Sequence, residues 1–419
     1  MAQRPVIWIG IDVGKRTHHA CAIDTDGKVV FSRKVSNDQA AIEALLARAA
    51  EAAQDVRWAI DLTCSYAALL QVVLTAADQQ VVYVPGRVVD RMSGVFRGEA
   101  KTDARDAKVI AETARMRGAD LTTVTATDET TAELARLVAH REDLMADWVR
   151  GVNRLRDLLG SIFPGLEAAF DYSTRSALVL VTGFQTPQAL RDAGEAGVIE
   201  YLRAHRAWAP GIAAMAATAV EVAHAQTVAL PSETRTAILV AGLARRLLEL
   251  DREIKDTDKL ITTVFRSHPD AAIIESLPGL GPILGAEFLT ATHGGVGPEL
   301  GGFTSPGRLA SYAGLVPVPQ DSGRISGNLR RPRRYNRRLR RVFYMAALSS
   351  LKVNGPSRAF YQRKRSERML HTQALLALAR RLVDVLWAAC CVTGGCSPSP
   401  HHNPLSRLDT VIRIPPVTR

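Results

Sequence analysis

The sequence is poor in cysteine and has no long apolar run. Its five cysteines are odd in number and cluster toward the C-terminus, which argues against a disulfide framework and favours a reducing compartment. No apolar run reaches the length needed to cross a membrane, and the first residues lack the layout of a secretory signal. We therefore expect a soluble cytoplasmic protein that does not enter a membrane.

The sequence also has fewer acidic than basic residues. The 419-residue chain has 53 Lys and Arg against 42 Asp and Glu, which gives a net charge of +11 and an isoelectric point near 9.7. This balance favours a polyanionic partner, and nucleic acid is the commonest one. A hydrophobic content of 47% is ordinary for a folded protein, and the length indicates two or three domains.

Residues 1–127 are predicted to form an α/β domain. The apolar run PVIWIGIDVG, residues 5–14, predicts a first strand, and Asp26-Gly27 predicts the turn of a following hairpin. The next elements expected are a helix behind an Asn/Asp cap over 37–51, a strand over 56–61, a helix over 65–77 and a strand over 79–85. The last helix of this domain lies in RGEAKTDARDAKVIAETARM, residues 97–116.

Residues 128–268 are predicted to form a region of long helices. One apolar stripe runs from Leu134 to Ile162, and near-heptad spacing links apolar residues from Leu243 to Ile261. Such helices would pair as an antiparallel coiled coil, within one chain or between two copies, or pack as ordinary core helices. Between them lies an Ala-rich helical insert, about residues 165–233, without a chemical motif.

Residues 269–395 form the third predicted domain, which is mainly helical. It begins with LPGLG, residues 277–281, a turn between short apolar helices that resembles a helix-hairpin-helix, whose amides can approach a phosphate backbone. The tail, residues 396–419, is rich in Pro and Ser and is predicted to be disordered. The cysteines and histidines near it do not have the spacing of a structural zinc site.

Four aspartates stand out by their positions. Asp12 and Asp61 end predicted strands, whereas Asp103 and Asp106 are three apart and share one helix face. Adjacent parallel strands would place the first two side by side, with the helix across their ends. Clustered negative charges repel unless cations lie among them, and hard oxygen ligands suit Mg²⁺, with Mn²⁺ as an alternative. Two such ions, roughly 3.5–4 Å apart, would support phosphoryl transfer. Taken singly, each acid would be a cap or a surface charge.

The densest basic segment holds nine arginines between Arg324 and Arg341. Such a run repels itself in isolation and favours contact with phosphates, and Tyr335 within it has a ring that can stack on a base. A second basic stretch surrounds Lys364, where backbone contact and a solvated helix face stay equally open. The predicted nucleic-acid contacts are Lys101, Arg324, Arg330, Arg331, Arg333, Arg334, Arg337, Arg338, Arg340, Arg341, Arg363, Lys364 and Arg365.

Ser322 lies in a loop just ahead of the arginines, between Asp321 and Gly323. A serine hydroxyl is a poor nucleophile until a base or a metal activates it, and surrounding cations would stabilise the charge on an attacked phosphate. The alternative is a Ser-Gly turn without chemistry. Competing serines nearby are Ser305, Ser311 and Ser326.

Six segments together resemble the DEDD-type insertion-sequence transposases that work with a bridge RNA, a family that also includes the Piv DNA invertases. The segments are IGIDVGKRTHHACAID, AIDLTCSYAALL, YVPGRVVDRMSGVFRGEAKTDARDAKVIAETARM, LPGLGPILGAEFL, LASYAGLVPVPQDSGRISGNLRRPRRYNRRLRR, and FYQRKRSE with HTQALLALARR. They span about residues 6–390, and KTDARDA and GLVPVPQDSG are the most specific parts.

The resemblance implies an N-terminal RuvC-like domain of RNase H fold, a coiled-coil middle and a C-terminal transposase domain. It implies that the acidic tetrad falls on Asp12, Asp61, Asp103 and Asp106, and that Ser322 attacks DNA and becomes covalently joined to it. Donor and target DNA would pair with a bridge RNA encoded by the element. A homodimer would assemble into a tetramer at the bacterial nucleoid, with serine and acids from different copies.

One position departs from the family pattern. The second acid is usually Glu, and this chain has Asp61, whose side chain is one methylene shorter. We expect Asp61 to bind metal with a shifted geometry. If Asp61 is only a buried cap, the tetrad is incomplete.

Three other functions compete with this one. The segment GIDVGKRTHHACAIDTDGKV also resembles the first phosphate loop of actin-like sugar kinases, but the second phosphate loop and the adenosine site of that fold are missing from the sequence. A RuvC-like junction nuclease would cut with the acids alone and use Ser322 only in a turn. A non-enzymatic nucleic-acid-binding protein would need neither set of residues.

Overall fold

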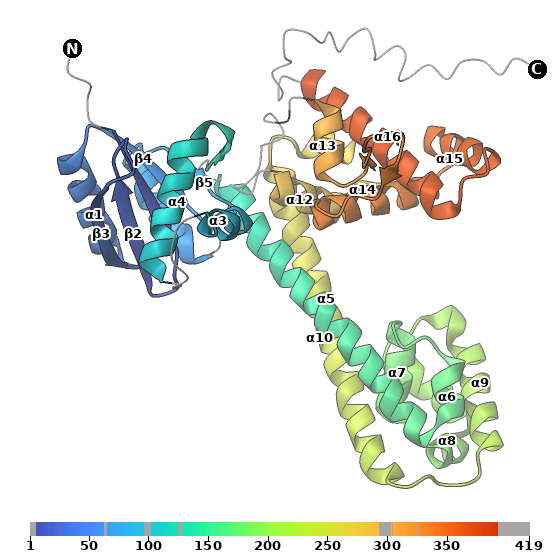
Figure 1. Ribbon diagram of the computed structural model, residues 1–419. Helices are drawn as coiled ribbons and strands as arrows, with labels where there is room; N and C mark the ends of the chain where they lie inside the picture. The colour runs from blue at the N-terminus through green and yellow to red at the C-terminus, as the bar shows by residue number, and fades with distance from the viewer. Residues whose placement is uncertain are drawn as a thin grey trace, which may run out of the picture. The chain divides into compact units, whose positions relative to one another are not determined.

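The computed structural model describes residues 6–62, 65–95, 102–124, 128–292, 303, 305–324 and 326–392. The chain divides into two compact units, one of Met1–Ala135 with Arg266–Arg419 and one of Arg136–Phe265. A central sheet near the N-terminus and a helical C-terminal part confirm the mixed α/β plus α class (Figure 1). Lys101 and the predicted tail, residues 396–419, lie outside the described residues.

The N-terminal sheet has the strand order β3-β2-β1-β4-β5-β6. Its strands are β1 (Val6–Asp12), β2 (Thr17–Ile23), β3 (Val29–Ser36), β4 (Asp55–Ile60), β5 (Val81–Tyr83) and β6 (Thr122–Thr123). The first three strands are antiparallel, and β4 and β5 continue the sheet parallel to β1. The predicted hairpin joins β2 to β3, and Gly27 takes the positive φ of 82° that its turn requires.

Helices cover both faces of this sheet. On one face, α1 (Gln39–Ala52) and α2 (Ala68–Ala76) pack on the alternating isoleucines of β1. On the other face, α4 (Asp103–Arg117) packs on β1 and β2, and α3 (Gly86–Ser93) lies beside it. The pattern predicted every element except α3 and β6, whose short segments have no clear apolar period.

The second unit consists of two long antiparallel helices and a helical insert. The long helices are α5 (Glu129–Ile162) and α10 (Glu233–Ser267), and the insert contains α6 (Pro164–Ala169), α7 (Arg175–Gly183), α8 (Pro187–Ala204) and α9 (Ile212–Ala225). Helices α5 and α10 lie side by side (Figure 1). Arg141 of α5 pairs with Asp258 of α10, and Gly151 lies against the side chain of Leu247. The two long helices pair within the chain, and pairing between two copies stays a prediction.

The C-terminal part is a cluster of helices. Its elements are α11 (Ala271–Glu275), α12 (Pro282–Thr292), α13 (Pro306–Tyr312), β7 (Val318–Pro319), β8 (Leu329–Arg330), α14 (Arg337–Ser350), α15 (Pro356–Ser366) and α16 (His371–Val392). The turn between α11 and α12 contains Gly279, where a Cβ would overlap the carbonyl of Ala346 in α14. Close packing on α14 therefore explains this glycine without a phosphate ligand. Among the described helices, none is long and apolar enough to span a membrane.

Candidate active site

Asp12 and Asp61 lie at the same edge of the sheet. Asp12 is the last residue of β1, and Asp61 directly follows β4. The two strands are parallel and adjacent, with Ile11 opposite Ile60, so both aspartates emerge at the carboxyl end. The backbone N–H of Val13 donates to Oδ1 of Asp61 over 3.2 Å, which joins the two strand ends directly. The adjacency expected from the sequence is therefore present.

Helix α4 brings its first turn to this edge. A Cβ on Gly10 would overlap the backbone of Ala107 and Ala111, so the glycine lets α4 lie directly on β1. At the other end of the helix, Glu112 approaches the hairpin glycine Gly27. Because that hairpin lies at the amino end of β1, α4 runs antiparallel to the strand and begins at the strand's carboxyl end.

The far end of α4 is anchored by a buried ion pair. The side chain of Glu112 is 8% exposed and bonds Arg115, whose guanidinium also donates to the carbonyl of Thr25 in the hairpin. The sequence alone did not distinguish Glu112 from the other acids of this helix. The difference is positional, since Glu112 faces the hairpin while Asp103 and Asp106 lie in the first turn.

The first turn of α4 carries two aspartates by local helix physics. Thr102 caps the helix by accepting from the N–H of Arg105, and Asp103 and Asp106 lie where the helix dipole stabilises negative charge. Asp103 is exposed and Asp106 half-buried. The guanidinium of Arg105 donates to the carbonyl of Ser93 over 3.1 Å, which ties this turn to the end of α3.

The charges at this edge interact. Burial raises the pKa of Asp61 above its ordinary value, the N–H of Val13 opposes this by stabilising the carboxylate, and the negative charge of Asp106 raises the pKa further. Asp61 is therefore both a hydrogen-bond acceptor that holds β1 and a member of a repelling group of carboxylates. A cation at this edge would relieve that repulsion.

The donor set fits a divalent metal by its chemistry. Carboxylate oxygens are the hard ligands that Mg²⁺ takes. Within the described residues, which include all four aspartates, no three His, Cys, Asp or Glu side chains lie close enough together to hold a metal ion. The structure thus brings the strand ends and the helix start to one edge, and coordination by four aspartates stays a prediction.

Ser322 lies in the loop of a short hairpin. Strands β7 and β8 pair antiparallel, and the loop is closed by the N–H of Gln320 to the carbonyl of Asn328 and by the N–H of Asn328 to Oδ1 of Asp321. Ser322 is exposed, and Gly323 next to it has a positive φ of 55°. Of the competing serines, Ser305 caps α13 by accepting from Arg308, so it has a structural role.

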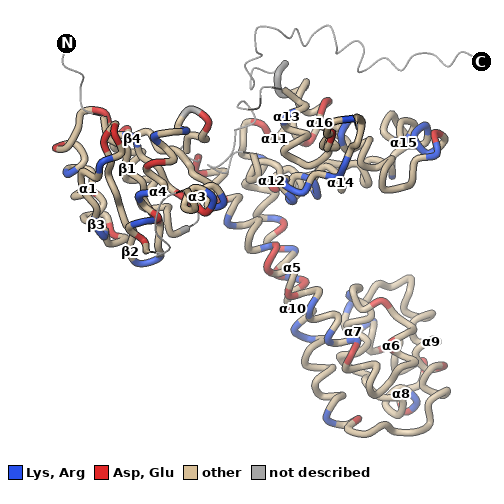
Figure 2. Tube along the Cα trace, viewed as in Figure 1, with Lys and Arg blue, Asp and Glu red and all other residues tan. Residues whose placement is uncertain are grey.

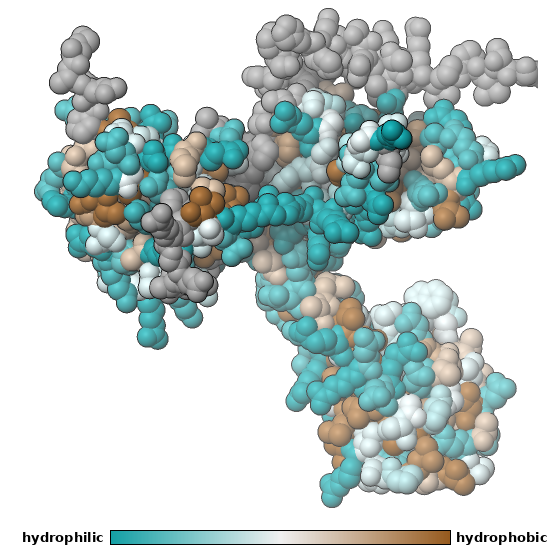
Figure 3. All heavy atoms as spheres, viewed as in Figure 1, coloured by the Kyte–Doolittle hydropathy of each residue, from teal (hydrophilic) through white to brown (hydrophobic). Residues whose placement is uncertain are grey.

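Most of the predicted arginine contacts around Ser322 are exposed. The exposed side chains are those of Arg324, Arg330, Arg331, Arg333, Arg334, Arg337 and Arg341, and those of Arg338 and Arg340 are half-buried. Figure 2 shows basic residues gathered along α14, and the face visible there in Figure 3 is mostly hydrophilic. This surface has the charge and the exposure that phosphate contact requires.

Two of these arginines also hold the fold together. Arg341 pairs with Glu287 of α12, whose side chain is only 2% exposed. Arg340 donates to the carbonyl of Gly314 and lies over the ring of Tyr335, 5.0 Å from its centroid. Gly314 must be a glycine because it has a φ of 69° and a Cβ would overlap that ring. The sequence did not show these roles, since the partners lie far away in the chain.

The second basic stretch is bonded to its own helix and to the residues that directly follow it. Lys364 pairs with Glu367 over 2.6 Å, and Arg365 donates to the carbonyl of Met369. Arg363 lies over the ring of Phe360, 5.1 Å from its centroid. All three are near the C-terminus of α15, where positive charge is stabilised by the helix dipole. These contacts favour the solvated helix face for this stretch.

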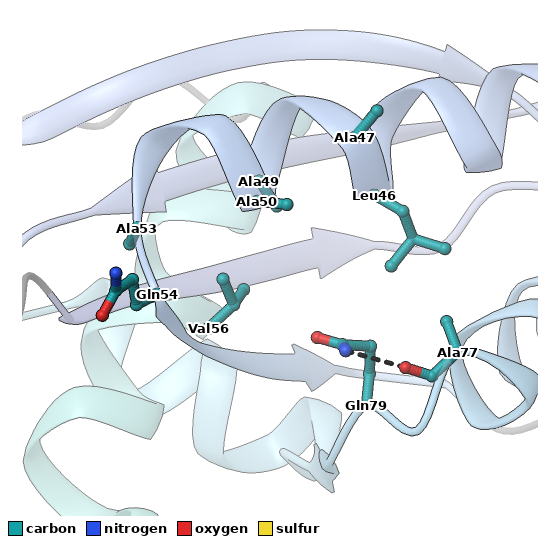
Figure 4. Close-up of a pocket in the computed structure, with 9 residues that line it drawn as sticks. All are labelled: Leu46, Ala47, Ala49, Ala50, Ala53, Gln54, Val56, Ala77 and Gln79. Atoms are coloured by element: carbon teal, nitrogen blue, oxygen red, sulfur yellow. Dashed lines mark hydrogen bonds between the residues drawn. The ribbon is translucent and has the colours of Figure 1, made fainter.

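A shallow pocket of about 350 Å³ lies at the opposite end of the N-terminal sheet (Figure 4). It is lined by alanines of α1 together with Leu46, Val56 and Gln79, near the start of β4. None of the four aspartates lines it, and it contains no titratable side chain. This pocket therefore has no part in the chemistry expected at the carboxyl edge.

Two family models match the chain. A transposase model, DEDD_Tnp_IS110, matches residues 9–164, which include all four aspartates. A model described as Transposase IS116/IS110/IS902 family matches residues 271–362, which include Ser322 and the nine arginines.

Similar proteins come from insertion elements. A 44.8 kDa protein of insertion element IS116 from Streptomyces clavuligerus is 51% identical over 383 residues, covering 91% of this chain and 94% of that protein. A 42 kDa protein of insertion element IS900 from Mycobacterium paratuberculosis is 48% identical over 91% of this chain and 95% of that protein. A 43.6 kDa protein of insertion element IS110 from Streptomyces coelicolor is 33% identical, again over 91% of this chain and 93% of that protein.

Proposed function

The chain belongs to the IS116/IS110/IS902 transposase family, and from that premise we propose that it cuts and rejoins DNA with Ser322 as nucleophile and the four aspartates as metal ligands. Membership makes it an insertion-sequence transposase that acts on DNA and depends on a divalent metal. The serine, the ligand set, the ion and the guide are our proposals.

One observation carries the proposal: Asp12, Asp61 and the first turn of α4 lie at one edge of one sheet. A fold gains nothing in stability by gathering carboxylates, because they repel. Burial and a neighbouring carboxylate raise the pKa of Asp61, a pattern that is typical of functional sites. The antiparallel β1-β2-β3 meander continued by parallel strands supports a RuvC-like assignment for this domain.

The serine would act in two transfers. Oγ of Ser322 attacks a DNA phosphorus, an O–P bond forms, and the bond to the departing sugar oxygen breaks; the serine proton passes to solvent, and the departing oxygen takes a proton from solvent. A sugar hydroxyl of the second DNA then attacks the same phosphorus and releases Oγ. A divalent ion held by Asp12, Asp61, Asp103 and Asp106 would supply charge stabilisation for the phosphate. The exposed arginines around Ser322 would hold the phosphates in place.

Guidance by a bridge RNA is part of the proposal. The exposed arginine surface around Ser322 has the charge for a second nucleic acid as well as for DNA, and sequence specificity would then come from base pairing. We further propose that the protein works as a homodimer that assembles into a tetramer, at the nucleoid where element DNA lies. Mg²⁺ is the proposed ion, with Mn²⁺ as a substitute.

The decisive experiment is recombination of donor and target plasmids with purified protein, Mg²⁺ and the RNA transcribed beside the gene. We expect joined products and a protein–DNA adduct that resists denaturation and is lost in Ser322→Ala. Ser326→Ala, a change of the same size in the same loop, should keep both.

Each failure has its own meaning. Cleavage that survives Ser322→Ala but not Asp103→Asn would replace the serine mechanism with a nuclease that uses the acids alone. Recombination without the RNA would remove the guide from the proposal. Binding of DNA without any strand cleavage, unchanged by Asp103→Asn, would leave only a nucleic-acid-binding protein.

A further inference from the structure

Asn37 joins the two segments that follow the strand-end aspartates. Its side-chain nitrogen donates to the carbonyl of Lys15 over 3.2 Å and to the carbonyl of Tyr66 over 3.1 Å. Lys15 lies three residues beyond Asp12, and Tyr66 lies five residues beyond Asp61. One amide therefore ties the chain leaving β1 to the chain leaving β4, beside the edge where both carboxylates emerge.

The orientation of this amide is determined by its partners. A carbonyl oxygen only accepts hydrogen bonds, so the nitrogen of the Asn37 amide must face both carbonyls and its Oδ1 must point away from them. Oδ1 is buried, and it has no hydrogen-bond partner among the described residues. The amide cannot be flipped without losing both bonds.

His18 fills the space beside this amide. Its side chain is 2% exposed, and neither ring nitrogen has a hydrogen-bond partner in the part of the chain that the structure describes. Burial lowers the pKa of His18, and the Asn37 amide next to it opposes the shift. The buried ring of His18 therefore lies next to the Asn37 amide, whose nitrogen is held by the two carbonyls.

Two further contacts strengthen the same link. The backbone N–H of Asn37 donates to the carbonyl of Arg16 over 3.0 Å, which fixes Asn37 to the segment after β1. The Lys15 ammonium lies 5.9 Å from the centroid of the Tyr66 ring, a weak cation–π contact between the same two segments. Capping of α1 does not account for Asn37, because the adjacent Asp38 caps that helix by accepting from Ala41.

We propose that Asn37 is a positioning residue, which sets the separation of the Asp12 and Asp61 carboxylates by tying together the segments that follow them. The proposal rests on the metal-binding role assigned above to these aspartates. Removing a residue that orients metal ligands commonly weakens metal binding by about 10–100-fold. Asn37 would act in this way through the backbone, without touching the ion.

The experiment measures Mn²⁺ binding to the full-length protein without nucleic acid, from the electron paramagnetic resonance signal of the free ion. We expect Asn37→Ala to raise the Kd for Mn²⁺ at least about tenfold. Asn37→Asp has the same size but lacks the donors and should weaken binding as much, so it tests the bonds if the alanine variant folds poorly. Lys15→Ala, a change at an exposed position that keeps the backbone carbonyl bonded to Asn37, should weaken binding only about twofold.

Gln79 provides the matched control. Its amide also joins two segments of this domain, because it donates to the carbonyl of Ala77 (Figure 4) and accepts from the indole N–H of Trp58. It lies at the opposite end of β4 from Asp61. Gln79→Ala should therefore lower thermal stability about as much as Asn37→Ala while its Kd for Mn²⁺ stays within about twofold of the wild type.

The outcomes separate this inference from the proposed function. Wild-type binding that is lost in Asp12→Asn but unchanged in both Asn37 variants would overturn the inference alone. Equal weakening by Gln79→Ala would also overturn it, because general loosening of the domain would then be the cause. Absence of Mn²⁺ binding in the wild-type protein would remove the metal site of the proposed function, and this inference with it.

Discussion

The carboxyl edge of the N-terminal sheet and the hairpin of Ser322 are built in opposite ways. At the sheet edge, Asp12 ends β1, Asp61 directly follows β4, and the other two aspartates lie in the first turn of α4, which lies so close to β1 that only a glycine fits between them. The serine hairpin has two strands of two residues each, and Ser322 and most arginines around it are exposed.

This difference indicates which partner each region needs. Carboxylates that must share an ion have to be held at fixed separations, because a displacement of a fraction of an ångström changes the coordination. A serine and arginines that must follow a polyanion can be ordered by that polyanion itself. Four predictions test the contrast, from the largest expected effect to the smallest.

Gly10→Ala should damage the sheet edge most. The added methyl group would overlap the backbone of α4, so we expect the free energy of unfolding to fall by about 3 kcal/mol. Gly118→Ala, where a Cβ would meet nothing within 4 Å, should change it by less than about 0.5 kcal/mol. Urea denaturation measures both, and equal midpoints for the two variants would show that α4 is not held closely on β1.

Arg341→Ala and Arg333→Ala should have different effects, because Arg341 forms an ion pair with a buried residue and Arg333 is only exposed. Arg341→Ala removes the ion pair between Arg341 and the buried carboxylate of Glu287, and because Arg341 itself is half exposed we expect a loss of about 1–3 kcal/mol. Arg333→Ala should leave stability within about 0.5 kcal/mol and instead lower the salt dependence of DNA binding by about one counterion. Thermal melts measure the stability of both variants, and DNA affinity at several salt concentrations measures the counterions released. An Arg341→Ala variant as stable as the wild type would contradict the pairing.

Ser305→Ala and Ser322→Ala should have opposite effects on stability and activity. Ser305 caps α13, so its loss should cost about 1 kcal/mol of stability and leave strand joining measurable. Ser322 is exposed, so its loss should change stability by less than about 0.5 kcal/mol while removing the DNA adduct. Calorimetry and adduct formation on the same samples test this. A marked fall in stability for Ser322→Ala would mean that the hairpin itself depends on the hydroxyl.

The pH dependence of stability should report on Asp61. Its pKa is raised in the folded state, so between the unfolded and folded values the folded protein binds more protons than the unfolded chain. The contribution is therefore present at low pH and is lost as pH rises through that window, above the ordinary pKa of about 3.9. Asp61→Asn should remove this slope from the urea midpoint measured between pH 4 and pH 7 without metal. An unchanged slope would assign it to another group.

Much of the fold could be predicted because its signals are local. The alternating apolar residues of β1, the Asp26-Gly27 turn and the periods of α1 and α5 each depend on a few consecutive residues. Short elements without a period, such as α3 and β6, could not be found in this way. The sequence predicts an Asn/Asp cap before α1 without separating the two residues, and in the structure Asp38 caps the helix while Asn37 bonds the segment after β1.

The sequence by itself determined which residues are available for chemistry and which family the chain resembles. Asp12, Asp61, Asp103, Asp106 and Ser322 all lie in motifs that can be read from consecutive letters. Only the tertiary structure decided that β1 and β4 are neighbours, that α4 runs against β1, and that Arg341 meets Glu287. These facts depend on contacts between residues far apart in the chain, which are selected by burial of apolar surface and by backbone overlap, and no local pattern contains them.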